Sequence, residues 1–261
     1  MNLKIISWNV RGLNEQDKRL RVRNLVRQWG PDVVCLQETK MKLITRVVIC
    51  SLWGGQHVNW SYLGSYGASR GVLMMWDTQV LNKVEEQVGQ FSISCKFTSV
   101  SNQFVWAFID VYGPNSLRDR RFLWEELFGL SSWWNVPWCV GGDFNVVRFP
   151  SECSGSTLFT AAMQDFSNFI SEQGLFDLPL QGGSFTWLNF RKVALKARLD
   201  KFLFSTDWED NFPTVSQRRM SRLLSDHFPI VLEGCSFQRG RRPFRFENIW
   251  LTDEGFVVNL N

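Results

Sequence analysis

Polar side chains that can bind metal ions or move protons follow a series of apolar runs along the chain. They are Asn9, Glu38, Tyr112, Asn115, Asp143, Asn145, Asp200, Asp226 and His227. In an α/β sheet the ends of successive strands converge on one edge, where loops build the functional site. A single Asp or Asn after a strand is usually a turn residue, because its side chain caps local backbone groups. The repetition of acid, amide and imidazole groups at successive strand ends therefore indicates a site.

The chemistry that suits these groups is phosphoester cleavage with a hard cation. Glu38 offers carboxylate oxygen to Mg²⁺, which takes few carboxylates together with water and substrate phosphate. Of the two histidines, His57 lies in a polar, glycine-rich stretch typical of a surface. His227 directly follows Asp226, and a carboxylate partner would hold its imidazole protonated near a phosphate. A purely structural histidine is the alternative interpretation.

The elements that must position these groups alternate between strands and helices. Apolar runs at 3–8 and 33–37 flank a helical pattern that stops at Gly30-Pro31, and such a unit favours parallel strand pairing. The patterns predict further helices that begin at Ser116 and Thr160. They predict further strands at 71–76, 84–98, 103–112, 138–142, 184–187, 198–205 and 228–233.

Composition and charge place the chain among globular proteins. Its 261 residues are 44% hydrophobic and 21% charged, which argues for a large core and against disorder. The longest stretch without Asp, Glu, Lys or Arg, at 47–69, holds too many polar residues to cross a bilayer, and no signal peptide is expected. Six cysteines form no CxxC pair, so we expect reduced thiols in an intracellular protein.

The amino-acid composition changes after Gly234. Arginines cluster between 239 and 245 around Gly240 and Pro243, a pattern typical of a linker. We therefore predict a catalytic domain at 1–236, followed at 237–261 by an arginine-rich linker or the start of a missing C-terminal region.

Short motifs in a fixed order carry a resemblance to a known superfamily. They are Ser-Trp-Asn-Val-Arg-Gly-Leu at 7–13, Gln-Glu-Thr at 37–39, Tyr-Gly-Pro-Asn at 112–115, Gly-Asp-Phe-Asn at 142–145, Arg-Leu-Asp at 198–200 and Ser-Asp-His at 225–227. Together they resemble the endonuclease/exonuclease/phosphatase superfamily, which includes deoxyribonuclease I and the apurinic/apyrimidinic endonucleases. The 7–13 motif, Phe-Thr-Trp at 185–187 and the segment 242–250 are also similar to the endonuclease domain of plant LINE-type non-LTR retrotransposons.

The resemblance implies an α/β (α+β) fold of the deoxyribonuclease I type. This fold is a four-layer sandwich of two mixed, mainly antiparallel β-sheets flanked by helices, with the site at one end between the sheets. The strand pattern alone does not separate this sandwich from a doubly wound sheet.

The resemblance also assigns roles to the polar residues. Glu38 is the principal metal ligand and Asp226 a nearby metal-side acid, while Asp143 orients or deprotonates the attacking water. His227 contacts the scissile phosphate, with Asp200 as its carboxylate partner. Asn9 helps to hold Asp143, and Asn145 positions the water and the phosphate. The phosphate is also bound by Tyr112 and Asn115. Arg11 stands where many repair endonucleases carry an acid, which weakens the case for a second metal ion and for abasic-site repair.

The function implied is that of a Mg²⁺-dependent phosphodiester hydrolase, with Mn²⁺ as an alternative ion, that nicks target DNA and leaves a 3′-hydroxyl primer. The expected partners are DNA and, in a full-length element, a reverse transcriptase domain. We expect a nuclear monomer without membrane contact, whose Arg191, Lys192 and Lys196 bind DNA from a hairpin tip. Two alternatives stay open: a phosphatase or deadenylase of the same superfamily, and a catalytically inactive binding remnant.

Overall fold

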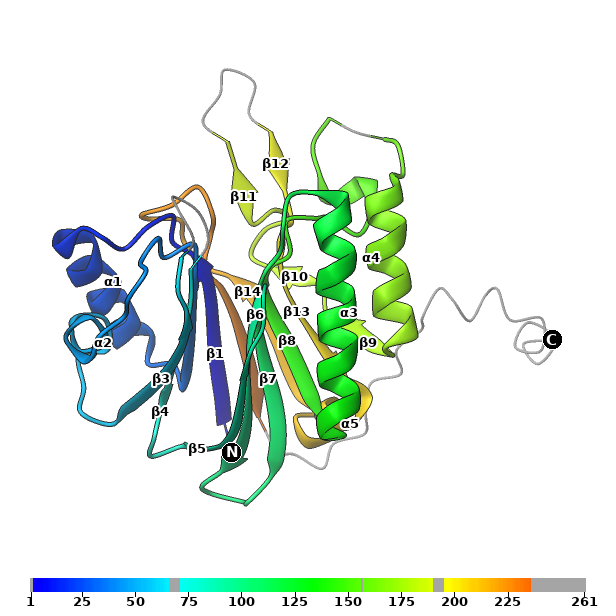
Figure 1. Cartoon of the computed structure of the whole chain (residues 1–261). Coiled ribbons are helices and arrows are strands. Elements are labelled where there is room, and N and C mark those ends of the chain that lie inside the picture. Colours follow the sequence, from blue (N-terminus) through cyan, green and yellow to red (C-terminus); the bar gives the residue numbers. More distant parts are fainter. Residues whose placement is uncertain (1, 66–70, 156, 190–194, 236–261) are drawn as a thin grey trace.

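The architecture consists of two β-sheets packed face to face, with helices on both outer faces (Figure 1). The computed structural model describes residues 2–65, 71–155, 157–189 and 195–235. Helices α1 (Gln16–Trp29) and α2 (Arg46–Trp53) cover one sheet, and α3 (Leu117–Trp134) and α4 (Ala161–Glu172) cover the other. The predicted four-layer sandwich is confirmed.

The first sheet has seven strands and contains both ends of the described chain. Its order is β10 (Leu180–Gln181), β14 (Thr214–Arg219), β15 (Ile230–Cys235), β1 (Asn2–Asn9), β2 (Val33–Gln37), β4 (Val72–Asp77) and β3 (Val58–Leu63). Strands β1 and β2 are connected by α1 and pair in parallel, as the strand–helix–strand pattern predicted. The other pairs are antiparallel except β10 with β14, so this sheet is mixed.

The second sheet has six strands and supplies the facing layer. Its order is β5 (Leu81–Val88), β6 (Ser92–Ser99), β7 (Val105–Tyr112), β8 (Trp138–Asp143), β13 (Asp200–Ser205) and β9 (Leu175–Asp177). Strands β7 and β8 are parallel and the other neighbours antiparallel. A separate antiparallel pair, β11 (Trp187–Leu188) with β12 (Lys196–Ala197), projects beyond the sheets (Figure 1).

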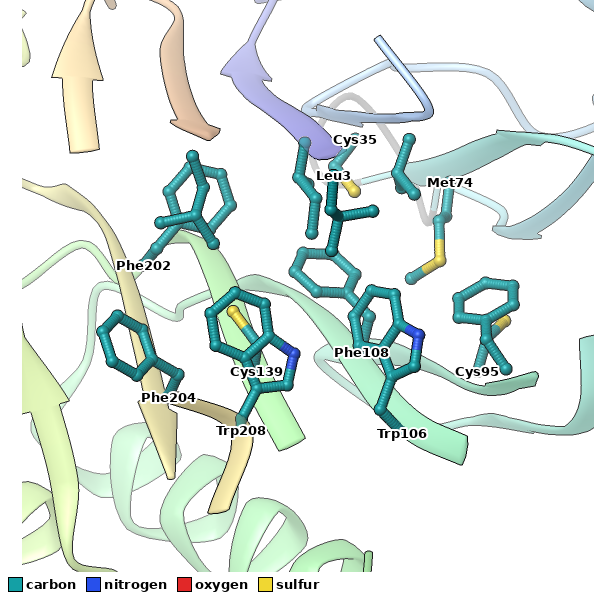
Figure 2. Packing of buried hydrophobic residues seen from close by; sticks show 14 of the residues in the cluster. Leu3, Cys35, Met74, Cys95, Trp106, Phe108, Cys139, Phe202, Phe204 and Trp208 are labelled. Atoms are coloured by element: carbon teal, nitrogen blue, oxygen red, sulfur yellow. The ribbon is translucent and has the colours of Figure 1, made fainter. Parts of the chain in front are cut away.

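The core between the sheets is rich in aromatic rings and thiols (Figure 2). Trp106 packs edge-on against Phe108 and Trp208, with ring centroids 6.4 and 6.1 Å apart. Cys35, Cys95 and Cys139 are buried among them as free thiols, as their apolar surroundings predicted. Burial on this scale holds the two sheets at a fixed separation, which a site built from both sheets needs.

Several elements differ from those that the sequence patterns predict. The run at 84–98 forms the hairpin β5–β6 rather than one strand, because the chain turns at Gly89 and Gln90. The patterns also missed α2, β3, α5 (Thr206–Asn211), β14 and the short strands β9, β10 and β12. Of the predicted strand at 184–187, only Trp187 lies in a strand, which is β11. Among the described helices, none is long and apolar enough to cross a membrane. The predicted boundary at 236 falls where the described residues end, so it stays a prediction.

Candidate active site

Strand register in the six-stranded sheet brings three of the predicted site residues onto one line. Asp143 ends β8, where it lies opposite Asp200 on β13 and Tyr112 on β7. Gly142 precedes it with a φ of 142°, and a Cβ atom there would collide with the carbonyl oxygen of Val111. Only glycine fits this position, so the Gly-Asp pair sets the direction in which the Asp143 carboxylate leaves the strand.

The seven-stranded sheet contributes Asn9 and Glu38 from the ends of adjacent parallel strands. Asn9 pairs with Gln37 in the register, and Glu38 follows directly. The Asn9 amide Nδ2 donates to Asp143 Oδ2 at 2.9 Å, and its Oδ1 accepts from the Arg11 backbone N–H at 3.1 Å. Because Asn9 is buried, this hydrogen bond fixes the Asp143 carboxylate between the two sheets.

His227 lies between the two carboxylates of the six-stranded sheet. Its Nδ1 is 3.0 Å from Asp200 Oδ2, and its Nε2 is 3.8 Å from Asp143 Oδ2. The predicted pairing of Asp200 with His227 is therefore present. The backbone of His227 is held as well, since Trp8 Nε1 donates to its carbonyl and its N–H donates to Ser225 Oγ, both at 3.2 Å.

Burial and charge set the protonation of this group. Burial lowers the pKa of His227, but the carboxylates of Asp200 and Asp143 outweigh it and raise the pKa to about 9. Burial raises the pKa of Asp143 to about 6, with His227 opposing that rise. Around pH 7 to 8 the site therefore holds the His227 imidazolium beside the Asp143 carboxylate, whose charge it partly neutralises.

A metal ion could be bound by the buried cluster around His227 or by Glu38. Ligand atoms of Asp143, Asp200 and His227 lie within 4.8 Å of one another, but the imidazole is already engaged by both carboxylates. Glu38 is different, because its carboxylate is partly exposed and pairs with Lys40 at 3.1 Å. Burial raises the pKa of Tyr112, and the negative charges of Glu38 and Asp143 raise it further. Glu38 and Asp143 therefore both lie close enough to Tyr112 to affect its ionisation. A carboxylate in this position fits Mg²⁺, which prefers few protein ligands and open positions for water and phosphate.

Asp226 lies beside the site but its carboxylate is engaged by cationic and neutral donors. Its Oδ2 accepts from Arg11 Nη1 at 2.6 Å and from Trp187 Nε1 at 2.8 Å. The side chain is 5% exposed, whereas that of Arg11 is 51% exposed. The resemblance implies that Asp226 is an acid near the metal ion. In the structure its carboxylate is paired with the Arg11 guanidinium.

The remaining predicted residues take different places. The Asn145 backbone N–H donates to Asp143 Oδ1 at 2.9 Å, and its Nδ2 donates to the Gly113 carbonyl at 2.8 Å. Asn115 is exposed just before α3. Lys196 is exposed on β12, and Arg191 and Lys192 lie outside the described residues.

A known protein family matches the part of the chain that contains these motifs. The sequence profile of the endonuclease/exonuclease/phosphatase family matches residues 6–227, which is most of the chain. The chain belongs to this family. The stretch that matches begins in β1 and ends at His227, so it contains the whole constellation described above.

Proteins similar to this chain include nucleases. An exodeoxyribonuclease of Bacillus subtilis is 26% identical over 88% of this chain and 98% of its own length. The DNA repair nuclease APEX1 of Danio rerio is 28% identical over 88% of this chain and 82% of its own length. The solved endonuclease domain of TRAS1, a telomere-specific non-LTR retrotransposon, superimposes with a TM-score of 0.68 at 14% identity, covering 90% of this chain and 99% of that domain. The last likeness shows a shared fold.

Two groups of residues support the site in ways that the sequence patterns did not predict. Thr186 is buried, and its Oγ1 accepts from the backbone N–H groups of Leu199 and Asp200, both at 3.0 Å. The motif at 185–187 marked this residue, but only the tertiary contact shows that it holds the start of β13.

The second group is a buried ion network behind Asp200. Lys201, with no exposed side-chain surface, lies 2.5 Å from Glu152 Oε1 and 3.1 Å from Asp177 Oδ2. Arg198 binds the same two carboxylates at 3.1 and 2.6 Å. A lysine inside an apolar strand was the one available signal for this network, since charged residues are rarely buried without partners.

Proposed function

We propose that this chain is a Mg²⁺-dependent phosphodiesterase that nicks DNA to prime retrotransposition. The observation that carries the proposal is the contact chain Asn9–Asp143–His227–Asp200, closed between two sheets and next to Glu38. The nuclease relatives and the retrotransposon endonuclease with the same fold support it.

The roles follow from the protonation states. Asp143, held by Asn9 and by the Asn145 backbone, accepts a proton from the attacking water. The His227 imidazolium, kept charged by Asp200, neutralises the negative charge that builds up on the phosphate oxygens. The water oxygen forms a bond to phosphorus and the bond to the 3′ oxygen breaks. That oxygen takes up a proton from solvent to leave a 3′-hydroxyl, and Asp143 returns its proton to solvent. Mg²⁺ held by Glu38 would supply further charge stabilisation.

The deciding experiment uses supercoiled plasmid as substrate. We expect the purified protein to convert it to the nicked circle with Mg²⁺ or Mn²⁺ and to stop when EDTA is added. Parallel reactions with an inositol phosphate and with polyadenylate test the phosphatase and deadenylase alternatives. Cleavage of either in preference to plasmid overturns the DNA assignment, and no hydrolysis of any of the three supports an inactive binding remnant.

A bell-shaped pH profile is expected for nicking. Asp143 must be ionised to accept a proton, so activity falls as pH drops through about 6, its raised pKa. His227 must be protonated, so activity also falls as pH rises through about 9. Steady-state rates between pH 5 and 10 at constant ionic strength measure both limbs.

The variant Asp200→Asn provides the internal control for that profile. Because the Asp200 charge raises the pKa of His227, its removal moves the alkaline limb to lower pH. An alkaline limb that stays near pH 9 in this variant contradicts the role given to His227.

We also propose that the β11–β12 pair carries DNA contacts. The pair projects from the end of the sandwich where β1 and β8 end in Asn9 and Asp143 (Figure 1). Replacing Arg191, Lys192 and Lys196 together by Ser is expected to weaken binding and to flatten its salt dependence by up to about three phosphate contacts. Fluorescence anisotropy of a labelled duplex from 50 to 300 mM salt checks this, and an unchanged slope would show that the three residues do not touch DNA.

The cellular setting completes the proposal. A nuclear monomer that works with a reverse transcriptase domain fits a nick that leaves a priming 3′-hydroxyl. Its domain at 1–236 would carry the catalysis, and the arginine-rich segment 237–261 would connect it to the rest of the element.

A further inference from the structure

A groove lies between the edge strand β5 and helix α3. It has a volume of about 530 Å³ and combines an apolar wall with acidic side chains. The apolar wall is formed by Leu130, Trp133 and Trp134, and the acids are Glu85, Glu86 and Glu126. None of the residues described around it is a catalytic residue, so the groove is separate from the site proposed above.

Strand β5 is an open edge of the six-stranded sheet. It is the first strand in the sheet order, and every residue from Asn82 to Val88 is exposed. Val84 and Val88 are 54% and 40% exposed, so apolar side chains lie on an edge without a neighbouring strand among the described residues. A free edge of this kind presents backbone N–H and C=O groups that can pair with another extended chain.

The acidic side chains of the groove are held in place. Glu85 accepts from Trp134 Nε1 at 2.8 Å and pairs with Lys96 at 2.9 Å. The Glu86 carboxylate points to the opposite face of β5, where it accepts from Ser61 Oγ on β3 at 2.7 Å and pairs with Lys83. Glu126 accepts from the backbone N–H of Gln90 at 2.8 Å and from Ser92 Oγ at 2.5 Å, but pairs with no cation among the described residues. The groove thus offers the carboxylates of Glu85 and Glu126, and its lining contains no Lys or Arg, although the chain as a whole has a net charge of +4.

Trp133 supplies the most exposed aromatic surface of the groove. Its side chain is 82% exposed, which leaves the ring face open. Arginine is the side chain that best fits an exposed indole ring next to carboxylates, because its guanidinium stacks on indole rings and bonds to carboxylates. DNA, in contrast, would find no cation in the groove lining to bind its phosphates.

We propose that β5 and the β5–α3 groove bind an extended, arginine-bearing segment of a partner protein. The segment pairs its backbone with the free edge of β5, covers Val84 and Val88 with apolar side chains, and places an arginine against Trp133 and the glutamates. Main-chain pairing supplies affinity and the side-chain pocket supplies specificity, as in other cases of strand addition.

The test uses a fluorescently labelled heptapeptide that alternates valine and arginine, titrated with the full chain and followed by anisotropy. We expect saturable binding that is lost when the arginines are replaced by glutamates. Trp133→Ala is expected to weaken binding about tenfold or more, since an aromatic anchor of an interface contributes at least that much. Plasmid nicking by this variant should equal that of the unmodified protein.

The matched control is Phe128→Ala on the same helix. Phe128 is 57% exposed and lines a neighbouring depression between α3 and α4, not the groove. Thermal unfolding of both variants shows that they remain folded. Tenfold weaker binding for Trp133→Ala with unchanged binding for Phe128→Ala supports the proposal. Equal effects of the two variants, equal binding of both peptides, or binding of neither peptide by the unmodified protein overturns it.

Discussion

Replacing Asp143 by Asn is expected to slow plasmid nicking by about 10² to 10⁴-fold, the contribution of a positioned general base. Asparagine keeps the size of the side chain and can still meet Asn9, but it cannot accept a proton from water. The loss therefore falls on the catalytic rate, and the affinity for duplex DNA at saturating metal concentration should change little. Single-turnover nicking rates together with anisotropy measurements separate the two quantities.

Asp110→Asn is the matched control for this prediction. Asp110 is a second fully buried carboxyl group in the six-stranded sheet, where it accepts from Gln37 Nε2 at 2.5 Å. Burial raises the pKa of Asp110 well above its usual range. An amide of the same size keeps an oxygen that can accept from Gln37, so nicking by this variant should change little. Nicking at the unmodified rate by Asp143→Asn, or an equal loss in both variants, contradicts the role of Asp143 as the base.

Lys201→Met is expected to lower the free energy of unfolding by about 3 to 5 kcal/mol, the usual result of removing one partner from a buried ion network. In the intact chain two cations face two carboxylates, and the variant leaves Glu152 and Asp177 to share Arg198 alone. One negative charge is then buried without compensation. Urea unfolding at pH 7, monitored by tryptophan fluorescence, measures the difference.

A surface ion pair provides the comparison. Arg218 and Glu233 lie 3.4 Å apart with side chains 44% and 37% exposed, so Arg218→Met is expected to cost no more than about 1 kcal/mol. If the two variants lose equal stability, the network behind Asp200 does not have the energetic role that its burial implies. Nicking assays at a temperature where Lys201→Met is folded then report whether the network also positions Asp200, its neighbour on β13.

The electrostatics of the site explain why the same carboxylates serve different purposes. Asp200 bonds to His227 Nδ1 and keeps the imidazole charged, whereas Asp143 faces Nε2 at 3.8 Å and has Asn9 and the Asn145 backbone as further partners. Asp226 is neutralised by Arg11 instead. Three acids close to one histidine thus have three different sets of partners, which give them different roles.

The amino-acid sequence by itself determined the local features of this protein. Alternating and helical apolar patterns predicted β1, α1 and β2 with their parallel pairing, because local propensity and the connection between neighbouring strands govern these choices. Motifs at strand ends predicted that polar groups gather at one edge, and the Ser116 cap of α3 follows from a hydrogen bond within four residues.

Only the tertiary structure decided which of these groups touch. Asp143 meets Asp200 because β8 and β13, far apart in sequence, are neighbours in one sheet, and Asn9 reaches Asp143 from the other sheet. The pairing of Arg11 with Asp226 joins positions more than two hundred residues apart. Strand alternation repeats every two residues whichever strand lies alongside, so it carries no information about the partner. Packing of the two sheets across the aromatic core, through contacts distant in sequence, selected the sandwich over a doubly wound sheet.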